Sequence, residues 1–317
     1  MRASWATLLL ISAVSADGWT NPLAPVSADP WVVRDGDSYL YTYTTGRNIV
    51  LARAASLAEL GRAPVRVVWT PPAAGPCSRN LWAPEIHRLD GRWYLYFAAD
   101  DGVDANHRMW VLAAESDDPF GAWRLVGKLA TPDDHWAIDG TVAEWRGQRW
   151  FVWSGWAGRQ WGPQHLYLAA MASPTALAGE RIAIASPTLA WERHGAPVNE
   201  GPTALVRDGV LHLLYSASVY FVEQYCVGLL TLRGADPRDP AAWAKQPQPV
   251  FAASAEVKGP GHASVTTSPD GRQWYLVYHA HHGPRRGNWV PRDLRAQPFA
   301  WGEDGLPRFG APVATVP

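Results

Sequence analysis

Four acidic residues and one histidine recur along the chain at nearly even intervals. In chain order they are Asp29, Glu85, Asp139, Glu200 and His262, separated by 56, 54, 61 and 62 residues. Carboxylates gathered at one site can divide the work of hydrolysis: one is ionised and activates water, one is protonated and assists a leaving oxygen, and a third raises the pKa of the acid. Clustered acids with a histidine could also hold calcium, and these residue types alone leave both alternatives open.

The five residues stand at the start of five similar segments. These read ADPWVVRDGDSYLYTYT, APEIHRLDGRWYLYFAA, IDGTVAEWRGQRWFVWSG, EGPTALVRDGVLHLLYSAS and GHASVTTSPDGRQWYLVYHA. Each has a short strand, a turn and an aromatic-rich strand, and four turns contain Asp-Gly where the third has Arg-Gly, which indicates hairpins.

A repeat of this length accommodates about four strands with their loops, which is the size of a propeller blade. We therefore predict an all-β fold, a five-bladed β-propeller over residues 21–317, in preference to a β-sandwich. The innermost strand of each blade lines the central channel. The polar residue that begins each hairpin should therefore occupy an equivalent place in its blade and point at one axial site.

Composition narrows the classes of partner. The chain has 28 basic and 29 acidic residues, a formal net charge of -1. That balance offers no field to attract nucleic acid or a membrane surface, so we expect neither as a partner. The chain has an unusual number of tryptophans, 19; some should be core, and exposed aromatic faces pack well against the apolar C–H face of a sugar. We expect a monomer that acts on a neutral carbohydrate.

Residues 1–16 are predicted to be a signal peptide. Arg2 is followed by the short apolar stretch WATLLLISAV and by small residues that end at Ala16, a pattern typical of export. A buried first helix is the alternative. The mature protein should then be secreted, either extracellular or periplasmic. Cys77 and Cys226 are the only cysteines, and whether they form a disulfide stays open.

With these motifs in order, the chain resembles glycoside hydrolase family 43, five-bladed propeller enzymes that degrade arabinan and xylan. The resemblance implies an inverting mechanism, with the catalytic base at Asp29 in ADPWV and the general acid at Glu200 in NEGPTAL. It places the aspartate that modulates the acid's pKa at Asp139 in AIDGTV. His262 in GPGHASV should sit on the axis beside a bound ion or water, and Arg292 in PRDLRAQPFAW should touch the reacting sugar.

The stretches WAIDGTV, VWSGW, VNEGPTAL, LLYSAS and VYHA most resemble the exo-α-1,5-L-arabinofuranosidase branch of that family. The expected activity is release of L-arabinofuranose from plant arabinan or arabino-oligosaccharides. Endo-1,5-α-L-arabinanase and β-xylosidase are the alternatives within the family, and a non-catalytic polysaccharide-binding propeller is the alternative of another class.

Further residues are expected to contact sugar or to make structural bonds. Trp82 should floor the sugar site, Trp153 or Trp156 should hold the next sugar, and Glu85 should make a structural hydrogen bond. The chemistry requires no cofactor. An axial calcium or sodium ion near His262 would be bound mostly by water, because one histidine with few protein oxygens is a loose site.

Overall fold

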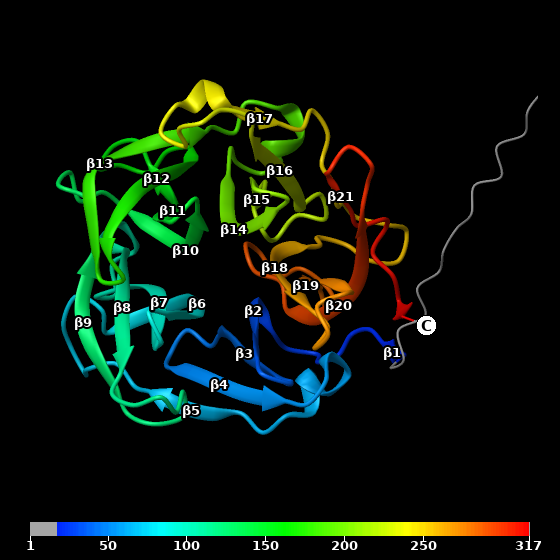
Figure 1. Cartoon of the computed structure of the whole chain (residues 1–317), viewed down its shortest axis with the longest axis horizontal. Helices are drawn as coiled ribbons and strands as arrows, with labels where there is room; N and C mark the ends of the chain where they lie inside the picture. Colours follow the sequence, from blue (N-terminus) through cyan, green and yellow to red (C-terminus); the bar gives the residue numbers. More distant parts are fainter. Residues whose placement is uncertain (1–17, 317) are drawn as a thin grey trace, which may run out of the picture.

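The computed structural model describes residues 18–316, and the predicted signal peptide, residues 1–16, lies outside them. Within the described residues, five four-stranded antiparallel sheets stand around a central axis (Figure 1). Each sheet is built from four strands that are consecutive in the chain. The predicted all-β, five-bladed β-propeller is therefore confirmed.

Each blade takes its strands from the axis outward. The first blade comprises β2 (Ala28–Asp35), β3 (Ser38–Thr44), β4 (Ile49–Ala54) and β5 (Arg66–Trp69), and the second comprises β6 (Arg79–Leu89), β7 (Arg92–Asp100), β8 (Arg108–Ala114) and β9 (Trp123–Leu129). The third comprises β10 (Ala137–Trp145), β11 (Gln148–Trp156), β12 (Gln164–Ser173) and β13 (Ala176–Ala185), and the fourth comprises β14 (Asn199–Arg207), β15 (Val210–Ala217), β16 (Cys226–Leu232) and β17 (Trp243–Lys245). The fifth comprises β18 (Gly261–Thr267), β19 (Trp274–His281), β20 (Arg292–Trp301) and β21 (Pro307–Arg308).

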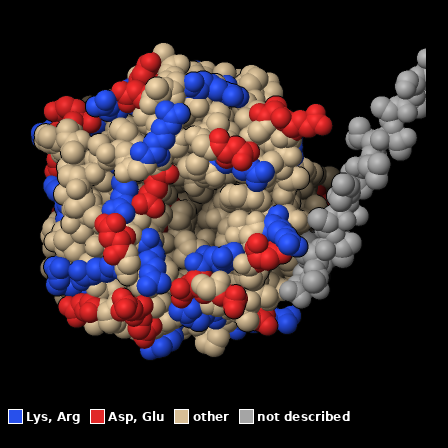
Figure 2. Space-filling model, in the orientation of Figure 1, with Lys and Arg blue, Asp and Glu red and all other residues tan. Residues whose placement is uncertain are grey.

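Short 3₁₀ helices account for the helical residues of the described chain. They are η1 (Leu57–Arg62), η2 (Asp104–Asn106), η3 (Ala190–Glu192) and η4 (Pro240–Ala242). No helix of residues 18–316 is long and apolar enough to cross a membrane. Charged side chains of both signs intermingle over the face seen in Figure 2, which is hollowed near its centre, so this face has no large area of one sign.

Tight turns join the first two strands of the blades as the sequence predicts. Asp90–Gly91, Arg146–Gly147 and Asp208–Gly209 each connect two strands with two residues. Both residues of each pair have positive φ, from 50° to 78°. This is the type I′ geometry, whose twist matches that of the strands it joins.

The core lies between the blades, because each sheet buries both faces against its neighbours. Five apolar clusters fill the five interfaces in turn around the ring. Cys77 lies in the cluster between the first and second blades, and Cys226 in that between the third and fourth. Both cysteines are buried and free, so no disulfide joins them.

The N-terminal segment closes the ring. Its backbone runs along the outer edge of β20: Leu23 N donates to Leu294 O at 2.7 Å, and Leu294 N donates to Ala24 O at 2.9 Å. A short strand β1 (Trp19–Thr20) pairs with β22 (Thr315–Val316) at the far end of the chain. The first residues described thus complete the fifth blade, which has only the two-residue β21 beyond β20.

Candidate active site

All five innermost strands bulge at the same place. The pairing register shifts after Ala28, Trp82, Ile138, Glu200 and Gly261, respectively. In each bulge one residue adopts a left-handed conformation: Asp29 (φ 55°), Ala83 (41°), Asp139 (56°), Gly201 (53°) and His262 (46°). A bulge of this kind bends the strand and redirects the side chain at its apex. Residues other than glycine rarely adopt this conformation, and it is common at functional sites.

The bulges correct one part of the predicted alignment. Asp29, Asp139 and His262 occupy the same apex position, but Glu200 stands one residue before the apex, where the second blade has Trp82. Glu85 stands two residues after its apex, beyond the register shift. The expectation that the five polar residues occupy equivalent positions is therefore wrong for Glu85 and Glu200, because spacing alone does not show a bulge.

Glu85 makes the structural hydrogen bond expected of it. It is 5% exposed, and its Oε2 lies 2.8 Å from Nε2 of His87, two residues along the same strand. Burial, with the nearby Asp139 carboxylate, raises the pKa of Glu85 well above its usual value. A protonated carboxyl that bonds a histidine of its own strand stabilises the strand, and this bond accounts for the burial of Glu85 without a catalytic role.

Bonds between neighbouring blades hold the bulge apices in place. The backbone N–H of Ala83 donates to Thr44 Oγ1 at 2.6 Å, that of His262 to Ser216 Oγ at 2.7 Å, and that of Asp29 to His279 Nδ1 at 3.1 Å. Thr44, Ser216 and His279 occupy one equivalent position, on the second strand of the preceding blade and opposite the residue before its bulge. We call these bonds inter-blade latches.

The fourth blade departs from the latch pattern in a way that bears on chemistry. The backbone N–H of Gly201 donates to the carboxylate Oδ2 of Asp139 at 3.1 Å. Ser154, which stands at the latch position of the third blade, donates instead to Asn199 O at 2.9 Å. The side chain of Asp139 is therefore held directly against the strand that carries Glu200.

Asp29 lies in surroundings that favour its ionised form. Nη1 of Arg292 donates to Asp29 Oδ1 at 2.8 Å, and Nδ1 of His262 lies 3.2 Å from the same oxygen. Burial alone would raise the pKa of Asp29, but Arg292, with the nearby His262, holds it well below its usual value. An ionised Asp29 can accept a proton from water.

Asp139 and Glu200 lie in surroundings that favour retention of a proton. Burial is the main cause for both residues. It raises the pKa of Glu200 to about 7, and the hydroxyl of Tyr225, donating to Glu200 Oε1 at 2.8 Å, limits that rise. For Asp139 the charges of Glu200 and Asp29 add to burial and raise the pKa well above its usual value. Because ionisation of one opposes ionisation of the other, the pair retains a proton while Asp29 is charged.

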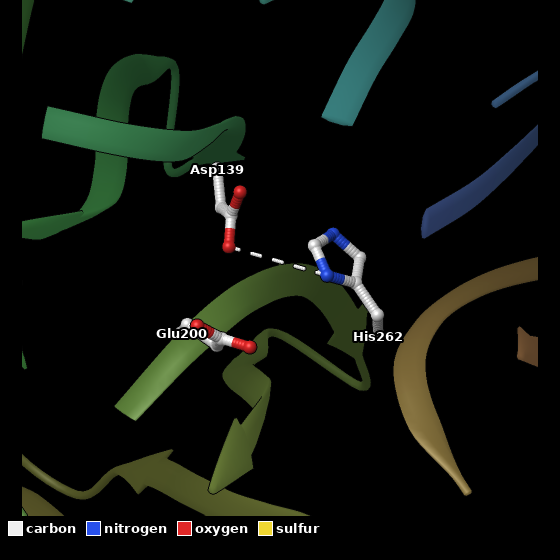
Figure 3. Close-up of side chains that lie close together, drawn as sticks. All are labelled: Asp139, Glu200 and His262. Atoms are coloured by element: carbon white, nitrogen blue, oxygen red, sulfur yellow. Dashed lines mark ion pairs between the residues drawn. The ribbon is translucent and has the colours of Figure 1, made fainter. Parts of the chain in front are cut away.

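His262 shares this space with the carboxylates. Figure 3 shows its ring directed toward the same region as Asp139 and Glu200, and Nδ1 lies 4.0 Å from Asp139 Oδ2. Asp139, Glu200 and His262 form the one group of three or more His, Cys, Asp or Glu found in residues 18–316 whose ligand atoms all lie within 4.8 Å of one another. They do not suit a resident cation together with acid catalysis, because carboxylate ligands must be ionised whereas a general acid must carry a proton.

Two predicted sugar contacts are compatible with their surroundings. Trp82 is partly exposed and stacks on the buried ring of His107 at 3.9 Å between ring centroids, which fixes the plane of its indole. Arg292 is partly exposed, and its guanidinium lies 4.3 Å from the ring centroid of Tyr220. Their contacts with a sugar stay a prediction.

The expectation that Trp153 or Trp156 holds the next sugar is wrong. Trp153 is 4% exposed and Trp156 is 3% exposed. Trp156 stacks on Trp136 at 4.4 Å with only 4° between the rings, and Trp153 stacks on Tyr167. Both indoles belong to the core between the second and third blades and leave no free face for a sugar.

Sequence reasoning missed Tyr225, His279 and Ser216. None is part of a motif that carries chemistry by itself, since Ser216 and His279 bond a residue of the next blade and Tyr225 reaches Glu200 from the β15–β16 connection. One signal could have found two of them: the place in the hairpin repeat held by Thr44, Ser216 and His279 has a hydrogen-bonding side chain in every blade except the second, which has Ala98 there.

Comparisons with known proteins agree with this geometry. The model of the family described as Glycosyl hydrolases family 43 matches residues 19–307. An extracellular exo-α-(1→5)-L-arabinofuranosidase of Streptomyces avermitilis is 39% identical over 93% of this chain, which spans 64% of that relative. A protein of the same name from Streptomyces chartreusis is also 39% identical, with 83% of this chain and 82% of the relative covered.

Among the solved structures, too, a similar protein is an α-L-arabinofuranosidase. The crystal structure of an α-L-arabinofuranosidase from Lactobacillus brevis superposes with a TM-score of 0.86 at 35% identity. The match covers 93% of this chain and 97% of that one. The present chain spans less than two thirds of the Streptomyces avermitilis relative.

Proposed function

The chain belongs to glycosyl hydrolases family 43, and from that premise we propose that it is a secreted, inverting α-L-arabinofuranosidase that releases arabinose from α-1,5-linked arabinan or arabino-oligosaccharides. The observation that carries the proposal is the division of the axial carboxylates: Asp29 is held ionised, while the pair Asp139 and Glu200 retains a proton. That division is what acid–base hydrolysis of a glycosidic bond requires.

In the proposed reaction Asp29 accepts a proton from water as the water oxygen attacks the anomeric carbon. The bond from that carbon to the glycosidic oxygen breaks, and Glu200 gives its proton to the leaving oxygen. Repulsion between the charges of Asp139 and Glu200 keeps one proton on this pair before the reaction, and Arg292 keeps Asp29 charged. The sugar is released with inverted configuration, and proton exchange with solvent restores both carboxyls.

The exo mode of attack has support from the loops around the site. The β15–β16 connection and the β19–β20 connection are joined to each other: Tyr220 donates to Asn288 O at 3.1 Å, and the guanidinium of Arg285 lies 4.5 Å from the ring centroid of Phe221. Tyr220 also contacts Arg292. Together they form a wall on one side of the carboxylates, as a pocket for a terminal sugar needs. The names of the most similar relatives point the same way.

A chromatographic time course on debranched linear arabinan tests the assignment. Single arabinose should appear from the start, with slow loss of viscosity, and proton NMR of the first product should show the inverted anomer. Early arabinobiose or longer fragments with a rapid fall in viscosity would show an endo enzyme. No release from any arabinoside or xyloside would favour the non-catalytic propeller.

An axial calcium or sodium ion beside His262 remains a separate proposal. The carboxylates next to His262 are engaged in acid–base work, so such an ion would take its ligands mostly from water. Exhaustive chelation in sodium-free buffer, followed by readdition of calcium or sodium, is the test. Unchanged activity after chelation, together with an unchanged rate for His262→Ala, would remove the ion from the mechanism.

A further inference from the structure

Two fully buried side chains connect the proposed acid with the proposed base. The hydroxyl of Tyr225 donates to Glu200 Oε1 at 2.8 Å, and Nδ1 of His279 accepts the backbone N–H of Asp29 at 3.1 Å. The rings of Tyr225 and His279 stack, with centroids 5.6 Å apart and 11° between their planes. A continuous path of contacts therefore runs from Glu200 in the fourth blade, through this stack, to Asp29 in the first.

The space for the stack depends on a glycine. Gly261 of β18 lies opposite His279 in the fifth blade. A Cβ at that position would lie 2.3 Å from Cε1 of Tyr225, so any other residue would displace the phenol ring. Both ring residues are 0% exposed, and neither can contact a substrate in this arrangement.

A histidine at this fully buried position costs free energy, because one of its ring nitrogens finds no partner in the described chain, unless the other nitrogen is needed as an acceptor. Burial lowers the pKa of His279 to about 3, so the ring is neutral and Nδ1 can accept. Nδ1 then cannot also donate to Asp29 Oδ1, which lies 3.4 Å away and already binds Arg292. The proton sits on Nε2, which finds no acceptor among residues 18–316. An aliphatic side chain would avoid that unsatisfied donor.

Resting on the proposed function, we propose that Tyr225 and His279 are positioning residues that together hold the general acid Glu200 and the general base Asp29 at a fixed separation. The base sits on a strained left-handed residue, so its N–H needs an acceptor from outside its own strand. Inversion needs a water between base and sugar, and a displacement of about 1 Å in such a site can cost about 10²-fold in rate.

The histidine is tested with a matched pair of substitutions. His279→Leu removes the acceptor at similar volume, whereas His279→Asn places Oδ1 where Nδ1 was. Both are assayed for kcat and KM on α-1,5-arabinobiose and on an aryl arabinofuranoside. His279→Leu should lower kcat about 10²-fold on both substrates, with KM within about twofold, and His279→Asn should restore most of that loss. Equal loss in the two variants, or no loss in His279→Leu, overturns the role.

The tyrosine is tested by Tyr225→Phe, which keeps the stack and removes the hydroxyl. Only proton donation by Glu200 should suffer. The variant should therefore lose about 10-fold in kcat on arabinobiose and far less on the aryl substrate, whose leaving group needs little protonation. Equal losses on the two substrates, or no loss on arabinobiose, would refute the role of Tyr225.

Thr44→Val is the control for loss of a latch as such. It breaks the equivalent bond at Ala83, a residue with no titratable side chain, and it should lower Tm as His279→Leu does while kcat on the aryl substrate stays within about twofold. The outcomes separate the proposed function from the proposed positioning role.

An inactive wild-type protein refutes the proposed function and with it this inference. An active wild type in which His279→Leu and His279→Asn fail equally refutes only the positioning role of His279.

Discussion

Three carboxylates at one axis differ because their nearest neighbours differ. Asp29 faces a guanidinium and two imidazoles, whereas Glu200 faces a phenol hydroxyl and Asp139 faces a backbone N–H and two other carboxylates. The same chemical group is thus ionised at one point and protonated a short distance away. Their roles as base, acid and modulator are proposals that single substitutions can separate.

The loss of turnover on removing the general acid should depend on the leaving group of the substrate, whereas the loss on removing the general base should not. Glu200→Ala should lower turnover of arabinobiose by about 10² to 10⁴ and be much milder on an aryl arabinofuranoside, because a good leaving group departs without a proton. Asp29→Ala should be severe on both substrates. Steady-state kinetics check this, with Glu303→Ala, an exposed glutamate, as the control. Equal loss on both substrates for Glu200→Ala would contradict its role as the acid.

The pH dependence follows from the pKa of Glu200. The acid must be protonated to act, so kcat/KM should fall as pH rises through about 7, the pKa to which burial raises Glu200. Asp139→Asn removes the second carboxyl of the coupled pair, so loss of the last proton, from Glu200, no longer places two like charges side by side and occurs at lower pH. The alkaline limb should therefore move to lower pH. Profiles at constant ionic strength measure the shift, and a limb that stays in place or moves upward would contradict the modulator role.

At the scale of secondary structure, the bulge in each innermost strand decides where side chains point. A regular strand alternates its side chains between two faces, and the register shift breaks that alternation at one residue. Gly201 illustrates the constraint, because it combines a φ of 53° with a tight approach: a Cβ there would lie 3.1 Å from Nδ1 of His262. The catalytic geometry is thus built into the element and not only into its side chains.

Gly201→Ala should therefore harm both stability and activity. An L-residue in the left-handed region costs about 1–2 kcal/mol, and the added methyl, 3.1 Å from Nδ1 of His262, would displace that ring. Thermal unfolding should show the lower Tm, and kcat should fall on both substrates. Ala83→Gly is the opposite change at the equivalent apex, relieving strain at φ 41°, and should leave Tm unchanged or raised. A Gly201→Ala protein with normal Tm and kcat would contradict this account.

At the scale of the whole molecule, the site depends on closure of a ring. Asn21 joins the first described segment to the last: its Nδ2 donates to Ala296 O at 2.9 Å and to Val313 O at 3.1 Å, and its Oδ1 accepts from Ala296 N at 3.1 Å. The latch from His279 to Asp29 crosses the same junction between the fifth and first blades. Stability of the junction and position of the base are therefore linked.

Asn21→Ala should be clearly destabilising. It removes the acceptor of the buried Ala296 N–H, at a cost of about 1–3 kcal/mol for an unsatisfied buried group, while Ala296 O keeps the bond from Nε1 of Trp19. Denaturant unfolding measures the change. Asn106→Ala, which removes amide bonds to Asp101 in an exposed loop, is the matched control and should stay within about 0.5 kcal/mol of the wild type. Similar losses of unfolding free energy in the two variants would show that the bonds of Asn21 do not stabilise the protein through closure of the ring.

The rim of the site offers better candidates for the second sugar than the buried indoles. Trp161 is 69% exposed and Trp289 is 50% exposed, and they lie in the β11–β12 and β19–β20 connections, which leave the sheets at the end where the inner strands bulge. Trp289→Ala and Trp161→Ala should raise KM for arabinotriose about 3- to 10-fold and leave the aryl substrate unaffected. Val206→Ala, another exposed apolar residue, is the control; unchanged KM in both tryptophan variants would exclude stacking there.

Most of the fold follows from local sequence. Turn dipeptides such as Asp90–Gly91 and alternating apolar residues specify hairpins, and their regular repeat specifies blades, because each of these signals acts between residues close in the chain. The motifs around Asp29, Asp139, Glu200, His262 and Arg292 likewise indicated the residues that meet at the axis. Asp29, Asp139, Glu200 and His262 could be predicted because they stand in short recurring segments of four blades that the repeat brings together, whereas Arg292 was indicated by the family resemblance.

Tertiary structure alone decided the rest. The bulges that separate Glu85 from the apex residues, the burial of Trp153 and Trp156, and the stack of Tyr225 on His279 all depend on contacts between blades, which local patterns do not encode. The pKa order of the carboxylates depends on the same contacts, since Arg292 and Asp29 stand 263 residues apart in the chain yet 2.8 Å apart in space. Sequence determined which groups are present, and packing around the closed ring determined the charge each carries and what each can reach.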